Sequence, residues 1–323
     1  NTARAVANWQ AVVDENATAL TSEQVQTAKD KAMLPVNADE IYKDWQDDLA
    51  KQPIGAIEFY RHTPPFQTLD LEVLSPKNSR RQECSSVYAD IDNFTRYVSD
   101  RIDDDETAKD VVRVLHVLRA ELECVLRDDF AGCKIRFIGD CIHGILIEGT
   151  AQTTDDGETA KNAMLCAAAM RSSFALALDL LADEGVDASD LGLAIGAEHG
   201  PVAVTRLGIK GEMVRCCISR SVLRAEGEQL RCNGRQTAVG PTLNQFAPQA
   251  FKDLFGVGRR RSDFDYDAAA QALAQADNAA KSASRPAASP LRSPSAAGAA
   301  AVAAGFGFPA AAASPSKIPP GFS

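Results

Sequence analysis

An acidic segment at residues 90–95, with the sequence DIDNFT, has the residue types that hold a metal-bound polyphosphate. It lies where a predicted strand over residues 85–90 ends and a polar turn leads into a helix. There a carboxylate can hold a cation, and free backbone N–H groups can meet phosphate oxygens. A pair of aspartates at a helix start also serves as an ordinary cap. This segment alone therefore does not establish a phosphate site.

A second candidate carboxylate, Asp140, follows Gly139 at the tip of a hairpin predicted over residues 134–148. Gly-Asp suits a primed two-residue turn, so by itself the pair indicates a surface turn with a solvated aspartate. That interpretation weakens because another acidic strand end lies about fifty residues upstream. A two-metal site needs carboxylates from separate chain segments, which these two segments supply.

Two arginines, Arg220 and Arg224, lie four residues apart in a helix predicted over residues 219–228, so they share one helix face. Guanidinium groups placed in this way can clamp a transferring phosphate. The alternative is a pair of surface arginines that meet Glu226 or Glu228, and the spacing alone favours that alternative.

The elements that must position these residues are mixed α and β from residue 84 to about residue 257. Helices are predicted over 105–127 and 158–181, where apolar residues recur at helical spacing, and over 244–255. Two strands, 191–195 and 202–207, are predicted on either side of a turn at residues 199–201. Upstream, helices are predicted over 3–31 and 41–49.

Three regions follow from these patterns. Residues 1–81 form a helical region and lead-in, and residues 82–257 form the α/β domain that carries the candidate site. Residues 258–323 form a tail that becomes rich in Ala, Pro, Ser and Gly after Asp267. Such a composition cannot bury enough apolar surface to fold alone, so this tail is predicted to be disordered.

Composition and charge narrow the function further. The net charge of −10 argues against DNA or RNA as a partner, because binding a nucleic acid backbone needs clustered positive charge. Eight cysteines without a C-x-x-C pair predict reduced thiols and a cytoplasmic protein. No stretch approaches about 18 consecutive apolar residues, which predicts no direct membrane insertion.

The order of these motifs resembles the catalytic domain of class III nucleotidyl cyclases. DIDNFT is followed by the Gly-Asp hairpin, then by IGAEHGP at residues 195–201, then by a helix ending Arg-x-Glu. The resemblance covers roughly residues 82–255. It implies an α/β (α+β) fold with a ferredoxin-like, mostly antiparallel sheet and packed helices. It also implies a homodimer, with the site between subunits.

The resemblance assigns roles residue by residue. Asp90 and Asp140 would bind two Mg²⁺ or Mn²⁺ ions, with help from the carbonyl of Ile91. The residues that cradle the triphosphate would be Asn93, Phe94 and Thr95. The residues that stabilise phosphate charge, contributed across the subunit interface, would be Arg220 and Arg224.

This sequence departs from the family pattern where the base is read. Adenylate-type members carry Lys, and guanylate-type members Glu, at the position of Arg136. The Asn with which family members stabilise the transition state is replaced by Arg220. The Asp with which adenylate cyclases recognise the base corresponds to a position near Met213, which is not acidic. The late hairpin that supplies a phosphate-binding Lys is not recognisable, although an arginine run at 259–261 could substitute. These departures resemble the bacterial Pycsar pyrimidine cyclases, whose cyclic nucleotide activates a separate effector in anti-phage defence.

Arg136 favours uracil on chemical grounds. A guanidinium only donates hydrogen bonds, and uracil presents carbonyl acceptors at O2 and O4, whereas adenine has no carbonyl. Cytosine O2 and guanine O6 can also accept. The hypothesis is therefore a uridylate cyclase that takes UTP. The alternatives are a cytidylate cyclase, an adenylate or guanylate cyclase, and a cyclase-fold module that binds nucleotide without turnover.

Overall fold

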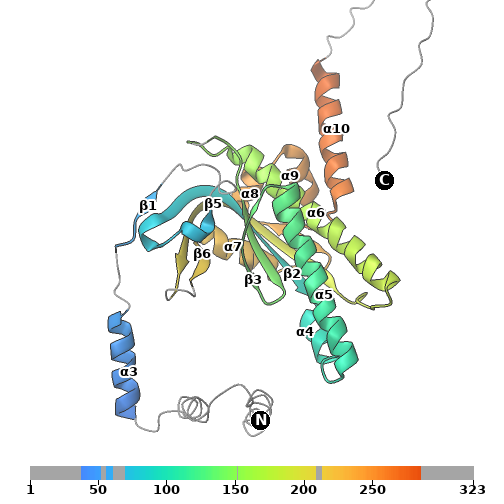
Figure 1. Ribbon diagram of the computed structural model, residues 1–323. Helices are drawn as coiled ribbons and strands as arrows, with labels where there is room; N and C mark the ends of the chain where they lie inside the picture. The colour runs from blue at the N-terminus through green and yellow to red at the C-terminus, as the bar shows by residue number, and fades with distance from the viewer. Residues whose placement is uncertain (1–37, 52–55, 61–69, 151, 209–212, 285–323) are drawn as a thin grey trace, which may run out of the picture. The chain divides into compact units, whose positions relative to one another are not determined.

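The computed structural model describes residues 38–51, 56–60, 70–150, 152–208 and 213–284 (Figure 1). Contacts divide the chain into two units, residues 1–278 and 279–323, and the candidate site lies in the first. The helix predicted over 41–49 is present as α3, Ala38–Lys51. The helix predicted over 3–31 lies outside the described residues.

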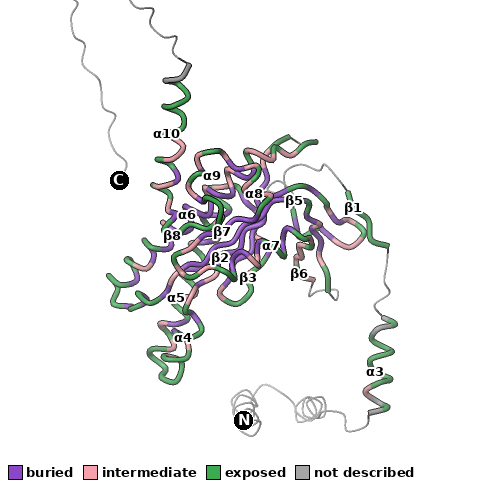
Figure 2. Tube along the Cα trace, turned by 180° about the vertical axis from the view of Figure 1, so that it is seen from behind, coloured by how far each residue is buried: buried purple, intermediate pink, exposed green. Residues whose placement is uncertain are grey.

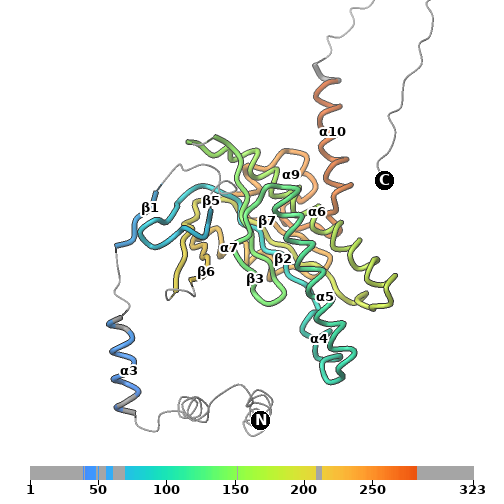
Figure 3. Tube along the Cα trace, in the orientation of Figure 1, coloured from blue at the N-terminus to red at the C-terminus, as the bar shows by residue number. Residues whose placement is uncertain are grey.

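One mostly antiparallel sheet forms the centre of the domain. Within the described residues its strand order is β3-β4-β2-β5-β7-β8, with β1 beside β2 and β6 beside β5. The strands are β1 Phe59–Tyr60, β2 Ser79–Asp92, β3 Cys133–Ile138, β4 Cys141–Leu146, β5 Gly192–Leu207, β6 Val214–Ile218, β7 Gln236–Val239 and β8 Arg260–Ser262. Strands β2 and β5 are far apart in sequence but lie side by side over 13 paired residues (Figure 3).

The helices cover both faces of this sheet. They are α4 Phe94–Ser99, α5 Asp105–Cys124, α6 Asp156–Asp183, α7 Arg220–Gln229, α8 Pro241–Phe246, α9 Gln249–Phe255 and α10 Tyr266–Ser284. Helices α5, α6, α8 and α9 share one apolar core with the sheet. A smaller core on the opposite face joins α7 to residues 71–74 of the lead-in. Figure 2 shows the buried residues gathered along the central strands.

The chain order β2-α5-β3-β4-α6-β5 and the antiparallel strand order β3-β4-β2-β5 make a ferredoxin-like centre, as the family resemblance implies. Strand β7 then joins β5 in parallel after the α7 crossover. Both long helices form where the apolar spacing predicted them, and each begins at an aspartate whose carboxylate accepts a backbone N–H. Sequence periodicity therefore located the two helices that cover one face.

The turn predicted at residues 199–201 is wrong, because β5 runs unbroken from Gly192 to Leu207. Strand β7 pairs with β5 only up to Ala197, and β6 pairs only from Ala203. Pro201 therefore lies beside one neighbouring strand, β2, and a proline is tolerated at such an open edge. The Gly-Pro pair is typical of a turn in sequence, but here it is an extended stretch between two short edge partners.

The boundary predicted at residue 258 is also wrong, because ordered elements continue to Ser284. Phe264 is fully buried and packs edge-on against Phe251 and Phe255, with ring centroids 5.7 Å and 4.8 Å away. This aromatic anchor holds β8 and the start of α10 to the domain. Disorder of the remaining tail, residues 285–323, concerns residues that the structure does not describe.

The helix predicted over residues 244–255 is two short helices, α8 and α9. Pro248 separates them, because proline cannot continue the hydrogen-bonding pattern of the preceding turn. The buried carboxylate of Glu198 accepts the backbone N–H groups of Leu243 at 2.7 Å and Thr242 at 3.4 Å, and so caps α8. This contact ties the start of α8 to the middle of β5.

Helix α6 is long and apolar enough to span a membrane by composition alone, the one such helix among the described residues. Its buried residues belong to the core beneath the sheet, which accounts for its hydropathy.

The helix also carries a buried charge, Arg171. The guanidinium of Arg171 donates to the carbonyls of Leu193 at 2.9 Å, Gln236 at 2.8 Å and Gly234 at 3.2 Å. Burial lowers the pKa of Arg171 to about 10.

An Arg171→Met variant is expected to unfold at a lower urea concentration, with a loss of about 3 kcal/mol, because it leaves buried carbonyls without donors. The control is Arg113→Met, which removes an exposed arginine in a surface ion pair and is expected to cost about 0.5 kcal/mol or less. Equal urea midpoints for the two variants would show that Arg171 does not hold α6 to the strands.

Candidate active site

Strand pairing brings the two candidate carboxylates together. Asp90 on β2 pairs with Cys141 on β4, and Asp140 directly precedes Cys141. Strands β3 and β4 are joined by the two-residue turn Gly139-Asp140, in which Gly139 has a φ of 62°. Glycine adopts this backbone conformation without strain. The predicted hairpin is thus confirmed, and its tip lies beside the acidic end of β2.

The electrostatics of the pair show that the carboxylates influence each other. Burial raises the pKa of Asp90, and the negative charges of Asp140 and Asp92 raise it further. Hydrogen bonds from the side chains of Cys141 and Gln229 oppose this increase. Burial also raises the pKa of Asp140. Two half-buried like charges in proximity create a place where a cation would be stabilising.

This donor set fits divalent cations that are shared with a substrate. The described residues contain no group of three or more His, Cys, Asp or Glu side chains arranged around a metal position. Mg²⁺ is commonly held by one or two carboxylates together with water and substrate phosphates. The side chain of Ile91 is buried in the core, so only its backbone carbonyl is available as a ligand. The pair Asp90 and Asp140 therefore suits ions that arrive with a polyphosphate.

The turn after β2 presents backbone groups more than side chains. Asn93 has a left-handed backbone with a φ of 71°, and its amide donates to the carbonyl of Asp190 at 3.2 Å. Phe94 is buried and stacks on Tyr97, with ring centroids 6.3 Å apart. Thr95 is exposed. Phosphate contacts at this turn would therefore come from backbone N–H groups and the Thr95 hydroxyl.

Asp92, the other acid of the DIDNFT segment, has a structural role. Its carboxylate accepts the backbone N–H of Gly234 at 2.6 Å and that of Asn93 at 3.1 Å. The first contact ties the end of β2 to the loop before β7. The sequence alone does not indicate which of the two aspartates has the structural role. The tertiary contacts do, because Asp92 accepts backbone N–H groups, whereas Asp90 lies beside the Asp140 hairpin.

Arg136 lies on the sheet face that carries α7. It is opposite His143 in the β3–β4 pairing, and His143 is opposite Tyr88 in the β2–β4 pairing. The rings of Tyr88 and His143 are stacked 4.2 Å apart, and Ser86 Oγ is 2.9 Å from His143 Nε2. Burial, and secondarily the charge of Arg136, lowers the pKa of His143 to about 3, so this ring is neutral near pH 7.

Tyr88 and Asp90 are two residues apart on β2, so their side chains point to the same face of the sheet. The buried Tyr88–His143 stack therefore lies between the exposed Arg136 and the carboxylate of Asp90 in the strand register. The sequence analysis missed this stack. The alternation of residues along β2 indicates that Tyr88 and Asp90 share a face of the sheet. It does not indicate His143, which meets Tyr88 only because β4 pairs with β2.

The two arginines of α7 lie on its exposed side. The buried face of the helix is Ser221, Val222, Ala225, Glu228 and Gln229. Arg220 and Arg224 are exposed, and Leu223 between them is 67% exposed. Among the described residues, neither guanidinium makes a hydrogen bond or ion pair, so the expected alternative of a surface pair with Glu226 or Glu228 is not formed. A single chain thus does not bring these arginines to Asp90 and Asp140.

Gln229 is a site residue that the sequence analysis missed. It is buried at the end of α7, and its side chain lies close enough to Asp90 to lower the pKa of that carboxyl. No local pattern marks a glutamine at a helix end as a partner of a strand 139 residues earlier. All eight cysteines are free in the structure.

This fold, with paired aspartates at the β2 end and the hairpin tip, is that of a class III nucleotidyl cyclase domain. A crystal structure of a "Class III adenylyl cyclase-like ATP-binding protein" from Pseudomonas aeruginosa is 49% identical, with a TM-score of 0.69. The match covers 79% of this chain and 54% of that one. No family model matches the chain.

More particularly, the chain is a relative of two curated proteins named uridylate cyclase. The protein from Pseudomonas aeruginosa is 49% identical over 255 residues, which is 79% of this chain and 49% of that protein. The protein from a Rhizobium species is 45% identical over 201 residues, which is 62% of this chain and 38% of that protein. The chain thus spans about half or less of the length of these relatives.

Proposed function

We propose that this chain is a nucleotidyl cyclase that converts UTP to 3′,5′-cyclic UMP and pyrophosphate. The observation that carries the proposal is the pairing of Asp90 with the Asp140 hairpin, on a sheet that also presents the exposed Arg136. The likeness to two curated uridylate cyclases supports UTP as the substrate.

Asp90 and Asp140, with the carbonyl of Ile91, would hold two Mg²⁺ or Mn²⁺ ions. When bound, such ions neutralise phosphate charge and make the ribose 3′-hydroxyl a better nucleophile. The turn at Asn93, Phe94 and Thr95 would orient the triphosphate through its backbone N–H groups. The 3′-oxygen then bonds to the α-phosphorus while the bond from that phosphorus to pyrophosphate breaks. The proton of the 3′-hydroxyl passes to solvent water, and pyrophosphate leaves.

Arg220 and Arg224 would act on the phosphates bound to a second copy of the chain. Their exposure on α7, without partners among the described residues, supports this arrangement. Guanidinium groups stabilise the charge that builds on the α- and β-phosphates in the transition state. The active form would therefore be a homodimer, with each site completed by the partner's α7.

Arg136 would read the base, because its guanidinium can donate to the carbonyl oxygens of uracil. A cytidylate cyclase is the second candidate, since the same donors can meet cytosine O2. We further infer that the cyclic nucleotide activates a separate effector protein in anti-phage defence in the cytoplasm. The resemblance to Pycsar cyclases supports this role.

The test is to incubate the purified chain with Mn²⁺ and each of the four ribonucleoside triphosphates, and to identify products by mass. Cyclic UMP is expected in about tenfold or greater excess, equivalent to about 1.4 kcal/mol of discrimination. Arg136→Ala is expected to reduce that preference, while Arg113→Ala, at an exposed site on α5, leaves it unchanged. Cyclic AMP or GMP as main product would overturn the pyrimidine assignment. No product from a folded dimer would favour a binding module.

A further inference from the structure

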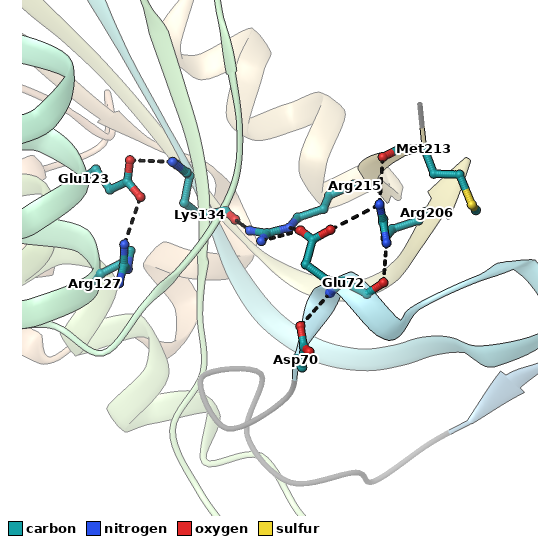
Figure 4. Close-up of polar contacts among 8 residues, drawn as sticks. All are labelled: Asp70, Glu72, Glu123, Arg127, Lys134, Arg206, Met213 and Arg215. Carbon is teal, nitrogen blue, oxygen red and sulfur yellow. Dashed lines mark hydrogen bonds and ion pairs between the residues drawn. The ribbon is translucent and has the colours of Figure 1, made fainter. Parts of the chain in front are cut away.

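A chain of polar contacts joins the lead-in segment to strand β3 (Figure 4). Glu72, in the short helix Leu71–Val73, accepts from Arg215 on β6, with Nε 2.8 Å and Nη2 2.6 Å from its Oε1. The same guanidinium donates through Nη1 to the backbone carbonyl of Lys134, at 2.9 Å. Arg215 therefore bridges the carboxylate of Glu72 and the backbone of β3.

Glu72 is itself held from two other directions. Arg206 on β5 is 3.1 Å from Glu72 Oε2, and it also donates to the backbone carbonyl of Glu72. The backbone N–H of Glu72 donates to Asp70 Oδ1 at 2.8 Å. The carboxylate that fixes Arg215 is thus anchored to β5 and to its own turn, and Figure 4 shows these groups converging on Glu72.

The contact at Lys134 falls at an irregular place in the sheet. Strand β3 is an edge strand of the described sheet, and its register with β4 shifts between Lys134 and Arg136. A bulge of this kind changes the direction in which the following side chain points. Edge strands also lack a second partner strand to hold their outer carbonyls. Arg215 supplies a donor to β3 at the residue where the bulge begins.

Arg136 depends on this backbone for its orientation. Its side chain is exposed and makes no hydrogen bond or ion pair with another described residue. Nearby Lys134 differs, because its ammonium group pairs with Glu123 on α5, which fixes the other side of the same strand segment. The direction of the Arg136 guanidinium is therefore set by the bulge.

We propose that Glu72 is a positioning residue for Arg136. By holding Arg215 against the Lys134 carbonyl, Glu72 sets the direction in which the Arg136 guanidinium points. That direction determines the choice between uracil and cytosine. This inference rests on the proposed function, in which Arg136 reads the base. Glu72 is 54% exposed, so its ion pairs contribute little to global stability. Its effect is on the geometry of one strand edge.

The experiment compares Glu72→Gln and Arg215→Lys with the wild-type chain, and Glu106→Gln is the control. Glu106 belongs to an exposed ion pair with Lys109 on α5, 2.6 Å long and separate from the contacts that hold β3. For each protein, kcat and KM are measured with UTP and with CTP. Amide hydrogen exchange at residues 135–137 is measured without nucleotide.

Glu72→Gln is expected to reduce the UTP-over-CTP ratio of kcat/KM about tenfold, mainly through a higher KM for UTP, because small misplacement of a binding group is costly. Exchange at 135–137 is expected to become faster. Arg215→Lys keeps the charge but cannot reach both acceptors, so it should behave like Glu72→Gln. Glu106→Gln should match wild type in both measurements.

Unchanged exchange in Glu72→Gln would overturn the inference, and so would an unchanged nucleotide ratio in a variant whose exchange is faster. A wild-type ratio in Arg215→Lys would also overturn it, because the bridge needs both ends of the guanidinium. Failure of the proposed function looks different, since the wild-type chain would then form no cyclic UMP. In that case the exchange measurement still decides whether Glu72 holds β3.

Discussion

An Asp140→Asn variant is expected to form cyclic UMP about a thousandfold more slowly than the wild-type chain, because the amide removes one of the two negative charges that would hold the divalent cations. The substitution keeps the shape of the side chain at the hairpin tip. Asp90→Asn should have the same effect from the other strand. Initial rates with Mn²⁺ and UTP, with product identified by mass, measure both.

The same variants test the electrostatics of the site without any nucleotide. The pKa of Asp90 is raised in the folded chain, by burial first and then by Asp140. A raised folded-state pKa means that the ionised carboxyl costs stability above that pKa, and the cost disappears as pH falls below the unfolded value. Asp90→Asn should therefore be at least as stable as wild type at pH 7, with the advantage lost in acid.

The control for both measurements is Asp179→Asn, at an exposed position on α6. It should keep full activity and the wild-type pH dependence of stability. An Asp140→Asn or Asp90→Asn protein with wild-type activity would show that the paired carboxylates do not hold the catalytic cations. A less stable Asp90→Asn protein at pH 7 would contradict the mutual repulsion of the pair.

Replacing Gly196 with alanine is expected to destabilise the domain by about 3 kcal/mol and to reduce cyclase activity. A Cβ at this position on β5 would overlap the backbone nitrogen of Gln229 and the backbone carbonyl of Ala225, and would lie 2.6 Å from the Gln229 Cα. Strand β5 cannot shift to make room for the Cβ, because Gly196 is paired with Tyr88 on one side and with Ala238 on the other.

Helix α7 must therefore move, and Gln229 would move away from Asp90. Urea unfolding and initial rates with UTP measure the two effects. The control is Gly227→Ala on the same helix, where an added Cβ meets nothing within 4 Å. Helix propensity favours alanine there by about 1 kcal/mol, so this control should be slightly more stable than wild type. If Gly196→Ala matched wild type in stability, the close approach of α7 to β5 would be disproved.

The features that could be predicted from the sequence are those that local chemistry determines. The Gly139-Asp140 turn was recognisable because glycine supplies the positive φ that such a turn needs. Helices α5 and α6 were recognisable from apolar spacing, since each buries one side against the sheet. The order of short motifs indicated the family, and the fold agrees with it.

Features that depend on which strands are neighbours were not predictable. Gly200-Pro201 is typical of a turn, yet it lies within β5, because the strands on that side stop short of it. Phe264 stands just before a tail of low complexity, and its burial against Phe251 and Phe255 is a tertiary contact. Neither outcome can be read from the residues adjacent in sequence.

By itself the sequence indicated the candidate site of this protein, namely two aspartates on separate strand ends, a candidate phosphate-binding turn and Arg136, which the family resemblance places at the base-reading position. The tertiary structure decided which groups meet. Antiparallel pairing brought Asp90 beside the Asp140 hairpin, and the α7 crossover brought Gln229 to Asp90. The contact from Glu72 to Arg215 spans 143 residues. Such contacts depend on the packing of distant strands, because no local propensity encodes the partner of a side chain that lies far away in the chain.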